Sequence, residues 1–470
     1  MLNIREVVSR KLCTGCGICK GICPVCAIEM MIDEYGIFTP QIDSEKCVDC
    51  ELCMKVCPGH EFDYVHHMQK LHGKLPDNVA IGPIIKAYAG YAADKSVLDI
   101  SQSGGFVSAL LIYGIENKLF DGAVVTSWNE KNPFEPSVYI AKTKDEVLKA
   151  VGSKYNPVPV AAIANKILKS DGRYAFVGTP CQIQGMRKAE DYVKGLADKI
   201  ALYVGLHCLS VFNYHYHDQI LHKIKKAKSE ISYFRFRDKK WRGWPCDMLL
   251  KTKSGETVNL TGTFSRLDAR SYFSNWRCQL CFDKFNEFSD VSCGDCRIPI
   301  HYGKSTMSEA YYHVNGKSDI VIRSVRANDV IEKMIADRVL YVEESEIKAL
   351  LSSVAIAEKK IGVNYAKRFI EKIGGTAPDY GVKFDICEEK NRKINKAWKN
   401  YSELVAGHYY FCHSMIKYRA FTYLLKITPH KLLGRWAVIR HWKSIQFAFR
   451  NECDIRIVAN NEKTNRERSL

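Results

Sequence analysis

Hydrophobic and polar positions alternate between strand-like and helix-like patterns from residue 81 to about residue 345. Short apolar runs rich in β-formers, such as DGAVVTSW, RYAFVGTP and KIALYVGLHC, predict strands. Between them lie segments with helical periodicity, such as FVSALLIYGIENKLF and KDEVLKAVGS. Gly and Pro close several of the strand-like runs, so we expect loops at strand ends to carry a functional site. The pattern predicts a mixed α/β domain.

The pattern differs on both sides of this domain. Residues 1–75 contain one strand-like run, GIFTPQID, between two cysteine-rich segments. A further helical stretch, EESEIKALLSSVAIAEKKIG, begins near residue 343. Residues 390–470 are basic and aromatic, and we expect this tail to be helical. One face of a helix in the tail would carry Val438, Trp442, Ile445 and Phe449.

Positive charge is concentrated in this tail. The chain has 470 residues and a net charge of +17, and residues 390–470 alone hold 17 Lys/Arg against 5 Asp/Glu. The rest of the chain is close to ordinary, so we expect no nucleic-acid partner. Two interpretations of the tail stay open. It is either a helix packed on the protein's own core, or an in-plane membrane anchor with basic residues against anionic lipid. In both cases the charge around the apolar face would come from Arg435, Arg440, Lys443 and Arg450.

The sequence shows no basic segment followed by an apolar stretch at its start, and no run of about 18 apolar residues. We therefore expect a cytoplasmic protein, with the tail as a route to peripheral contact at the inner face of the membrane. Thiols stay reduced in the cytoplasm. The nineteen cysteines, several in CxxC spacings, thus indicate metal or cluster ligation.

Two cysteine segments repeat one spacing. CTGCGICKGICP begins at Cys13 and CVDCELCMKVCP at Cys47, and both follow C-x2-C-x2-C-x3-C-P. This is the bacterial ferredoxin spacing, in which the fourth cysteine of each segment ligates the other 4Fe-4S cluster. Two zinc sites are the alternative, but zinc does not require an identical repeat. Cys26, outside the spacing, is interpreted as a small packing residue. We assign one cluster to Cys13, Cys16, Cys19 and Cys57, and the other to Cys47, Cys50, Cys53 and Cys23.

Four more thiols could meet at the edge of the predicted sheet. Cys181 and Cys208 each follow an apolar strand, and Cys278 and Cys281 form a CxxC. A third 4Fe-4S cluster is one interpretation, because the strands of one sheet tend to bring their ends together. The spacing leaves open a zinc ribbon, whose ligands would be Cys278, Cys281, Cys293 and Cys296.

Ser103, Gly104 and Gly105 precede the helical stretch FVSALLIYG. One interpretation is an N-cap with a flexible turn. The other is a turn whose N–H groups, at the positive end of the helix dipole, bind an anionic pyrophosphate. A second candidate turn contains Thr179 and Pro180, follows an apolar strand and presents Cys181.

Five stretches occur in order behind the two cysteine segments: SQSGGFVSALL, GSKYNP, FVGTPCQIQGMRK, GLHCLSV and WRCQLCFDKFNEFSDVSCGDC. Together they resemble the family of coenzyme F420 hydrogenase/dehydrogenase β-subunits, which includes the 7-hydroxymethyl chlorophyll a reductases. The resemblance covers roughly residues 1–345 and implies FAD with at least one 4Fe-4S cluster beside it. Cys293 and Cys296 depart from the usual pattern of the family. The resemblance carries the cluster onto Cys181, Cys208, Cys278 and Cys281, and the flavin site onto Ser103, Gly104, Gly105, Lys154, Tyr155, Thr179 and Pro180.

The expected fold class is α+β combined with α/β. A small bacterial-type two-cluster ferredoxin module is followed by a mixed α/β flavin-binding domain and a helical C-terminal extension. The expected boundaries are 1–75 for the ferredoxin module, 81–165 and 166–345 for the two parts of the flavoprotein domain, 346–389 for a helical segment, and 390–470 for the basic aromatic helical tail.

A flavin beside 4Fe-4S clusters would convert two-electron transfers into single-electron ones. We therefore expect an FAD- and 4Fe-4S-dependent oxidoreductase that links ferredoxin, or another electron-transfer subunit, to a small two-electron substrate. Coenzyme F420, a tetrapyrrole and a sugar-pathway intermediate are candidate substrates. Lys154 is the candidate catalytic residue, stabilising negative charge on the reduced flavin or its substrate; a solvated surface lysine is the alternative. The alternative function is that of a flavin-free, non-catalytic electron-transfer subunit.

Overall fold

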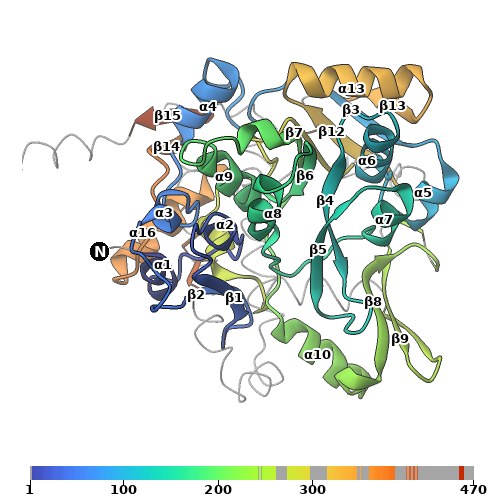
Figure 1. Cartoon of the computed structure of the whole chain (residues 1–470), viewed down its shortest axis with the longest axis horizontal. Coiled ribbons are helices and arrows are strands. Elements are labelled where there is room, and N and C mark those ends of the chain that lie inside the picture. The colour runs from blue at the N-terminus through green and yellow to red at the C-terminus, as the bar shows by residue number, and fades with distance from the viewer. Residues whose placement is uncertain are drawn as a thin grey trace, which may run out of the picture.

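The computed structural model describes most of the chain up to residue 386 and a few residues beyond (Figure 1). The described residues are 3–241, 243–244, 246–260, 272–296, 315–346, 350, 359–386, 399, 402–403, 406–407, 410 and 455–459.

A small N-terminal module carries the two cysteine segments. Its elements are α1 (Ile4–Ser9), α2 (Ile18–Gly21), β1 (Ile28–Ile32), β2 (Phe38–Ile42), α3 (Leu52–Lys55) and α4 (Tyr64–His72). The strand-like run GIFTPQID forms β2, which pairs antiparallel with β1. Each cysteine segment contains a helix of one turn, α2 or α3, directly after its cysteine loop.

An eight-stranded mixed sheet forms the centre of the molecule, in the order β13-β3-β12-β11-β7-β6-β4-β5. The strands are β3 (Lys86–Ala92), β4 (Gly122–Trp128), β5 (Pro136–Ala141), β6 (Tyr174–Gly178), β7 (Ile200–Leu206), β11 (Val291–Asp295), β12 (Ser318–Ile322) and β13 (Leu340–Glu344). Neighbours β4, β6, β7 and β11 run parallel, and the other pairs are antiparallel. The three quoted strand-like runs correspond to β4, β6 and β7, so the predicted mixed α/β domain is confirmed.

Helices cover both faces of this sheet (Figure 1). They are α5 (Lys95–Ile100), α6 (Phe106–Glu116), α7 (Lys144–Lys149), η1 (Val160–Ile163), α8 (Ala164–Leu168), α9 (Pro180–Ala189), η2 (Ala197–Lys199) and α13 (Val325–Ala336). Alternate strand residues point to opposite faces. Val125 therefore packs in the core with α6 and α13, and its neighbour Val124 packs in the other core with α8 and α9.

A second, three-stranded sheet stands beside the first. It consists of β8 (Ile231–Asp238), β9 (Asp247–Thr252) and β10 (Thr257–Leu260), and it adjoins α10 (His215–Ile224) and η3 (Lys228–Glu230). Its core is aromatic, with Phe234 and Phe236 of β8 packed against Tyr216 and Phe212. This sheet brings the basic residues of β8 toward the central sheet.

The C-terminal part differs from the helical expectation. The helix α16 (Gly362–Lys372) is present, but residues 382–386 form the strand β14 (Val382–Ile386). This strand pairs antiparallel with β15 (Ile455–Ala459). The tail therefore contains a strand, whereas a helical tail was expected. Residues 343 and 344, expected in a helix, belong to β13. The amphipathic stretch 434–450 lies outside the described residues.

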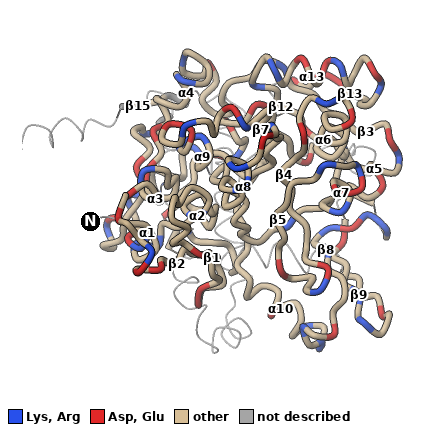
Figure 2. The backbone as a smooth tube through the Cα atoms, viewed as in Figure 1, with Lys and Arg blue, Asp and Glu red and all other residues tan. Residues whose placement is uncertain are grey.

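Acidic and basic residues alternate along the backbone of the part of the chain that the structure describes (Figure 2). Within that part, no helix is long and apolar enough to cross a membrane. The basic surplus of residues 390–470 falls mostly outside it.

Candidate functional site

The two cysteine loops adopt the same unusual backbone. Gly15 and Gly17 in the first loop have φ of 72° and 86°, and the corresponding Asp49 and Glu51 have φ of 51° and 57°. Left-handed backbone is free of steric cost only for glycine, so Asp49 and Glu51 adopt it against their preference. The repeated spacing therefore builds one loop twice, each followed by a short helix.

Cys13, Cys16, Cys19 and Cys57 lie together, and we call them the first cysteine set. Burial raises the pKa of the Cys13 thiol, and repulsion from the Cys57 thiolate raises it further. Burial also raises the pKa of Cys19, followed by repulsion from three members of the same set. The backbone N–H of Gly15 donates to Cys13 Sγ at 3.4 Å. The fourth thiol, Cys57, thus comes from the other loop, as the ferredoxin pattern requires.

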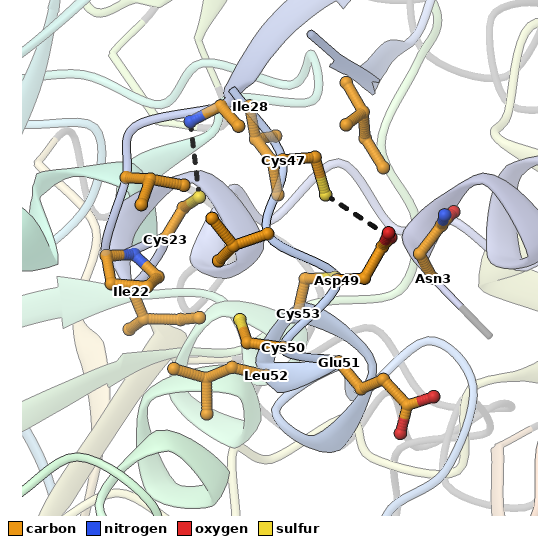
Figure 3. Close-up of a pocket in the computed structure, with 15 residues that line it drawn as sticks. Asn3, Ile22, Cys23, Ile28, Cys47, Asp49, Cys50, Glu51, Leu52 and Cys53 are labelled. Carbon is orange, nitrogen blue, oxygen red and sulfur yellow. Dashed lines mark hydrogen bonds between the residues drawn. The ribbon is translucent and has the colours of Figure 1, made fainter. Parts of the chain in front are cut away.

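Cys23, Cys47, Cys50 and Cys53 form the second cysteine set and line one pocket (Figure 3). The N–H of Ala27 donates to Cys23 Sγ at 3.3 Å, and Cys47 Sγ lies 3.7 Å from Asp49 Oδ1. Cys50 is exposed, whereas Cys16, Cys19 and Cys57 of the first set are buried. The second set is therefore the one nearer the protein surface.

Cys181, Cys208, Cys278 and Cys281 form a third cysteine set. Cys181 follows β6 and Cys208 follows β7, so both leave the carboxyl ends of adjacent parallel strands. Burial raises the pKa of Cys208, and repulsion from Cys278 and Cys181 raises it further. Burial and then repulsion from Cys16 raise the pKa of Cys181 to about 12. The third set therefore lies beside the first.

Cys293 and Cys296 do not complete a zinc ribbon with the CxxC. Cys293 lies buried within β11, and the N–H of Cys296 donates to the Lys317 carbonyl at 3.0 Å. Four sulfurs on one zinc would lie about 3.8 Å apart. Across the described ranges, the one group of three or more candidate ligand atoms within 4.8 Å is His66, His67 and Asp191. Among the described residues, the cysteine sets thus lack the compact grouping of ligand atoms that a zinc site requires.

The donor chemistry of the three sets fits 4Fe-4S clusters. Burial disfavours a free thiolate at these cysteines, and bound iron would reverse that preference by supplying positive charge. Cys26 joins none of the sets. Its interpretation as a packing residue is wrong, because it is exposed, and Asn165 Nδ2 donates to its sulfur at 3.6 Å.

Three residues that the sequence did not single out join the third set to the first. Arg277, next to Cys278, donates from Nε to the Leu12 carbonyl at 3.1 Å and from Nη2 to the Gly59 carbonyl at 3.0 Å. These carbonyls flank Cys13 and Cys57. Trp276 Nε1 donates to the Lys11 carbonyl at 3.1 Å. In the same way Lys188 of α9 donates to the carbonyls of Cys57 and Glu61. In the sequence, the only signal for Trp276 and Arg277 is that they directly precede the CxxC motif, and Lys188 has no such signal.

The turn of Ser103, Gly104 and Gly105 lies where β3 ends. Gly105, with φ of 77°, is the N-cap of α6, so a glycine fills the cap position in this turn. A Cβ on Gly104 would lie 2.3 Å from the Gly90 carbonyl oxygen and 2.7 Å from the Ser318 nitrogen. Gly104 therefore allows the turn to contact β3 and β12 closely, and the binding of a pyrophosphate at this turn stays a prediction.

Lys154 is not the solvated surface lysine of the alternative interpretation. Its Nζ donates to the Ala150 carbonyl at 2.6 Å, and burial followed by repulsion from Arg235 lowers its pKa to about 7. The adjacent Tyr155 hydroxyl accepts from Gln102 at 2.9 Å and from Arg237 at 3.3 Å. Because Gln102 precedes Ser103, the two candidate segments are connected.

Basic side chains from the second sheet surround the same turn. Lys239 Nζ donates to the carbonyls of Leu98 and Ser103 at 2.8 and 2.7 Å, and burial lowers its pKa to about 8. Arg235 donates to the Ile100 carbonyl at 2.9 Å. Arg237 pairs with Asp295 at the end of β11 at 2.6 Å. The turn thus lies among several cations, two of which, Arg235 and Arg237, also pair with Asp238 and Asp295.

The Thr179-Pro180 turn begins α9. The N–H of Thr179 donates to Gln182 Oε1 at 2.7 Å, and its hydroxyl lies 3.5 Å from Cys181 Sγ. Pro180 occupies the first turn of the helix, where its missing N–H has no cost. These residues orient Cys181.

The chain matches models of known protein families over most of the described length. Residues 87–165 and 171–348 match the N-terminal and C-terminal models described as "Coenzyme F420 hydrogenase/dehydrogenase, beta subunit". Residues 12–60 match the model of a 4Fe-4S dicluster domain, which supports the assignment of iron–sulfur clusters to the N-terminal module.

Individual relatives agree with these matches. The beta subunit of the coenzyme F420 hydrogenase of Methanosarcina barkeri is 26% identical over 337 residues, covering 68% of this chain and 97% of the relative. One of the subunits of the F420H2 dehydrogenase of Methanosarcina mazei is 27% identical over 314 residues, which cover 63% of this chain and 79% of the relative. A chain of the solved F420-reducing NiFe hydrogenase complex from Methanosarcina barkeri is 22% identical and has a TM-score of 0.49. The match covers 62% of this chain and 95% of the solved chain. On the family models, this iron–sulfur protein belongs to the family of coenzyme F420 hydrogenase/dehydrogenase beta subunits.

Proposed function

We propose that the chain is an FAD-dependent oxidoreductase that passes electrons between a protein partner and a two-electron organic substrate through three 4Fe-4S clusters. The observation that carries this proposal is the position of the third cysteine set. Its members Cys181 and Cys208 leave the carboxyl edge of the central sheet, Cys181 is close enough to Cys16 of the first set for electrostatic repulsion, and the basic turn at Ser103 lies at the same edge.

The order of the cysteine sets supports a relay. The second set includes the exposed Cys50, whereas Cys16, Cys19 and Cys57 of the first set are buried. Cys16 is also close enough to Cys181 of the third set to raise the pKa of that thiol by electrostatic repulsion. A redox partner would therefore contact the module near the second set. From there the sets run inward toward the sheet edge.

The carboxyl edge of an α/β sheet is the usual place for a ligand. Lys154, Arg235, Arg237 and Lys239 would hold the anionic part of FAD there. When bound, the flavin would exchange a hydride for the single electrons that 4Fe-4S clusters carry. Half-buried Lys154 would then place a positive charge where negative charge develops.

Coenzyme F420 is the substrate to test first, because two of the relatives are named for reactions of this coenzyme. Other reducible organic molecules stay open as substrates. A specific observation also favours the alternative: the same relatives are named as subunits. In that case the chain would relay electrons inside a larger complex and would hold no flavin.

The visible spectrum and turnover of the anaerobically purified chain distinguish these functions. We expect a brown protein with flavin shoulders that releases FAD on denaturation and reduces coenzyme F420 with a reduced low-potential dye. Arg237→Gln should lower the FAD content, whereas Lys131→Gln, a change in an exposed loop, should leave it unchanged. A brown protein that cannot be loaded with FAD would overturn the proposal and favour the relay function.

A further inference from the structure

A group of metal-binding side chains lies outside all three cysteine sets. His66 and His67 are in α4, and Asp191 is in the segment that follows α9. One ligand atom from each residue lies within 4.8 Å of the other two. His66 Nε2 is 3.2 Å from Asp191 Oδ2, and His67 Nε2 is 3.9 Å from the same oxygen. Both imidazoles thus direct the same kind of nitrogen at one carboxylate oxygen.

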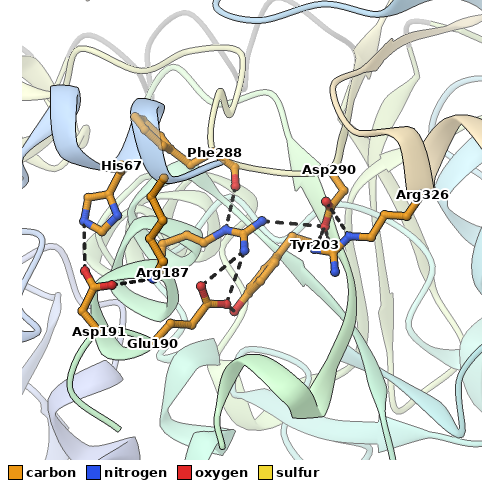
Figure 4. Close-up of polar contacts among 9 residues, drawn as sticks. His67, Arg187, Glu190, Asp191, Tyr203, Phe288, Asp290 and Arg326 are labelled. Carbon is orange, nitrogen blue, oxygen red and sulfur yellow. Dashed lines mark hydrogen bonds and ion pairs between the residues drawn. The ribbon is translucent and has the colours of Figure 1, made fainter. Parts of the chain in front are cut away.

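The surrounding contacts orient these three side chains. His67 is 3% exposed, and its ring stacks on Phe62 with a centroid distance of 4.4 Å. Lys70, one turn later in α4, pairs with the other carboxylate oxygen of Asp191. Figure 4 shows His67 and Asp191 facing each other beside the Arg187 and Glu190 contacts of α9. The Asp191 carboxylate is therefore held with Oδ2 toward the imidazoles.

We propose that His66, His67 and Asp191 bind a divalent transition metal ion, with zinc as the ion that their chemistry fits best. Two imidazole nitrogens and one carboxylate oxygen are common ligands of zinc, with bonds of about 2.0–2.2 Å. Ligand atoms around a tetrahedral ion at that distance lie about 3.3–3.6 Å apart. The observed 3.2 and 3.9 Å require little movement. His66 is half exposed, which leaves an open side for water.

The charges near this site set its strength. Lys70 competes for Asp191, and Lys188 of α9 is close enough to help lower the pKa of His67. Burial is the main cause of that shift, which brings the pKa to about 4. The two lysines would weaken the site without blocking it, because Lys70 pairs with Oδ1 of Asp191 and leaves Oδ2 to the imidazoles, and Lys188 is engaged by the carbonyls of Cys57 and Glu61.

The position of the site suggests what a metal would do. α4 closes the N-terminal module, and α9 begins at the strand end that presents Cys181. A metal held by both segments would connect the module with the domain that carries the third cysteine set. It would stabilise their contact from outside the cysteine sets.

Zinc binding to the cluster-loaded protein tests this proposal. One equivalent of zinc should bind without loss of cluster absorbance, and X-ray absorption at the zinc edge should show nitrogen and oxygen neighbours only. His66→Ala and Asp191→Asn should each weaken binding by at least about 10–100-fold, because even partners behind the ligands contribute that much. His215→Ala is the matched control: this histidine also lies 3.6 Å from an aspartate, Asp218, but has no third ligand within reach among the described residues.

Lys70→Gln separates a metal site from a simple ion pair. At a metal site, removing the competing ammonium should tighten zinc binding. At a simple ion pair it should leave zinc binding absent. Sulfur neighbours at the zinc edge, or equal binding by the wild type and His66→Ala, would overturn the proposal.

Discussion

Lys154 connects the protonation of one residue with cofactor binding. Its pKa is lowered to about 7, so the free protein loses this positive charge as the pH rises above 7. An anion bound nearby would raise the pKa again, and binding would take up a proton. We expect the affinity for FAD to be highest below pH 7 and to fall by up to about tenfold per pH unit above it. Lys239, with a pKa of about 8, should extend the fall to higher pH.

Titration of the flavin-free protein with FAD between pH 6 and 8 checks this expectation. Lys154→Met should bind FAD weakly at pH 6 and show little pH dependence in this range. Lys154→Arg keeps the charge at every pH and should bind well throughout. An affinity of the wild type that is constant from pH 6 to 8 would show that Lys154 does not face the flavin.

Single residues were predictable from the sequence where a short motif contains them. The ferredoxin spacing identifies eight cysteines, and the strand ends identify Cys181 and Cys208. Arg277 and Lys188 were not predictable, because their partners are backbone carbonyls of a distant segment. The role of Gly104 was also not readable, since the atoms that exclude its Cβ belong to β3 and β12.

At the scale of elements, the N-terminal module packs on the α/β domain through close backbone contacts. A Cβ on Gly21 in α2 would lie 2.3 Å from the Ala161 carbonyl oxygen and 3.0 Å from Ala164 Cβ. The N–H of Ala161 donates to the Cys16 carbonyl at 2.9 Å. The helix α2 therefore has a fixed position against η1 and α8, which keeps the first and third cysteine sets side by side.

Gly21→Val tests this contact. Because a rigid carbonyl blocks the new side chain, the substitution should destabilise the protein by about 1–3 kcal/mol. The measurement is the temperature at which the cluster absorbance is lost during heating without oxygen, which should fall. Gly185→Ala in α9 is the control, because its Cβ would meet only side chains, those of Ile18 and Pro58, at 3.1 Å or more. Equal temperatures for Gly21→Val and the wild type would show that the contact is loose.

Elements were predictable where hydrophobic periodicity is local. The runs that became β4, β6, β7 and α6 each contain their own pattern. The pair of β14 and β15 was missed, because the two strands lie about seventy residues apart and no short hairpin turn connects them. Likewise, the position of β8 beside the central sheet could not be predicted from the sequence. The arginines of the candidate flavin site come from this strand.

At the scale of the whole molecule, the basic tail distinguishes two forms of attachment. If residues 434–450 form an in-plane anchor, the full chain should sediment with anionic vesicles at low salt, with about 1 kcal/mol from each basic residue near the lipid. Arg440→Gln combined with Lys443→Gln should weaken sedimentation. Neutral vesicles serve as the control. A truncation after residue 390 is a poorer test, because it would also remove β15. Absence of binding to anionic vesicles would favour a helix packed on the protein itself.

The sheet edge should hold a third cluster beside the two of the N-terminal module. Iron content per chain, measured on anaerobically prepared protein, tests it most directly. We predict about twelve irons in the wild type, about eight in Cys208→Ser, and about twelve in Cys26→Ser, since each 4Fe-4S cluster contains four. About eight irons in the wild type, unchanged by Cys208→Ser, would show that Cys208 and its neighbours hold no cluster.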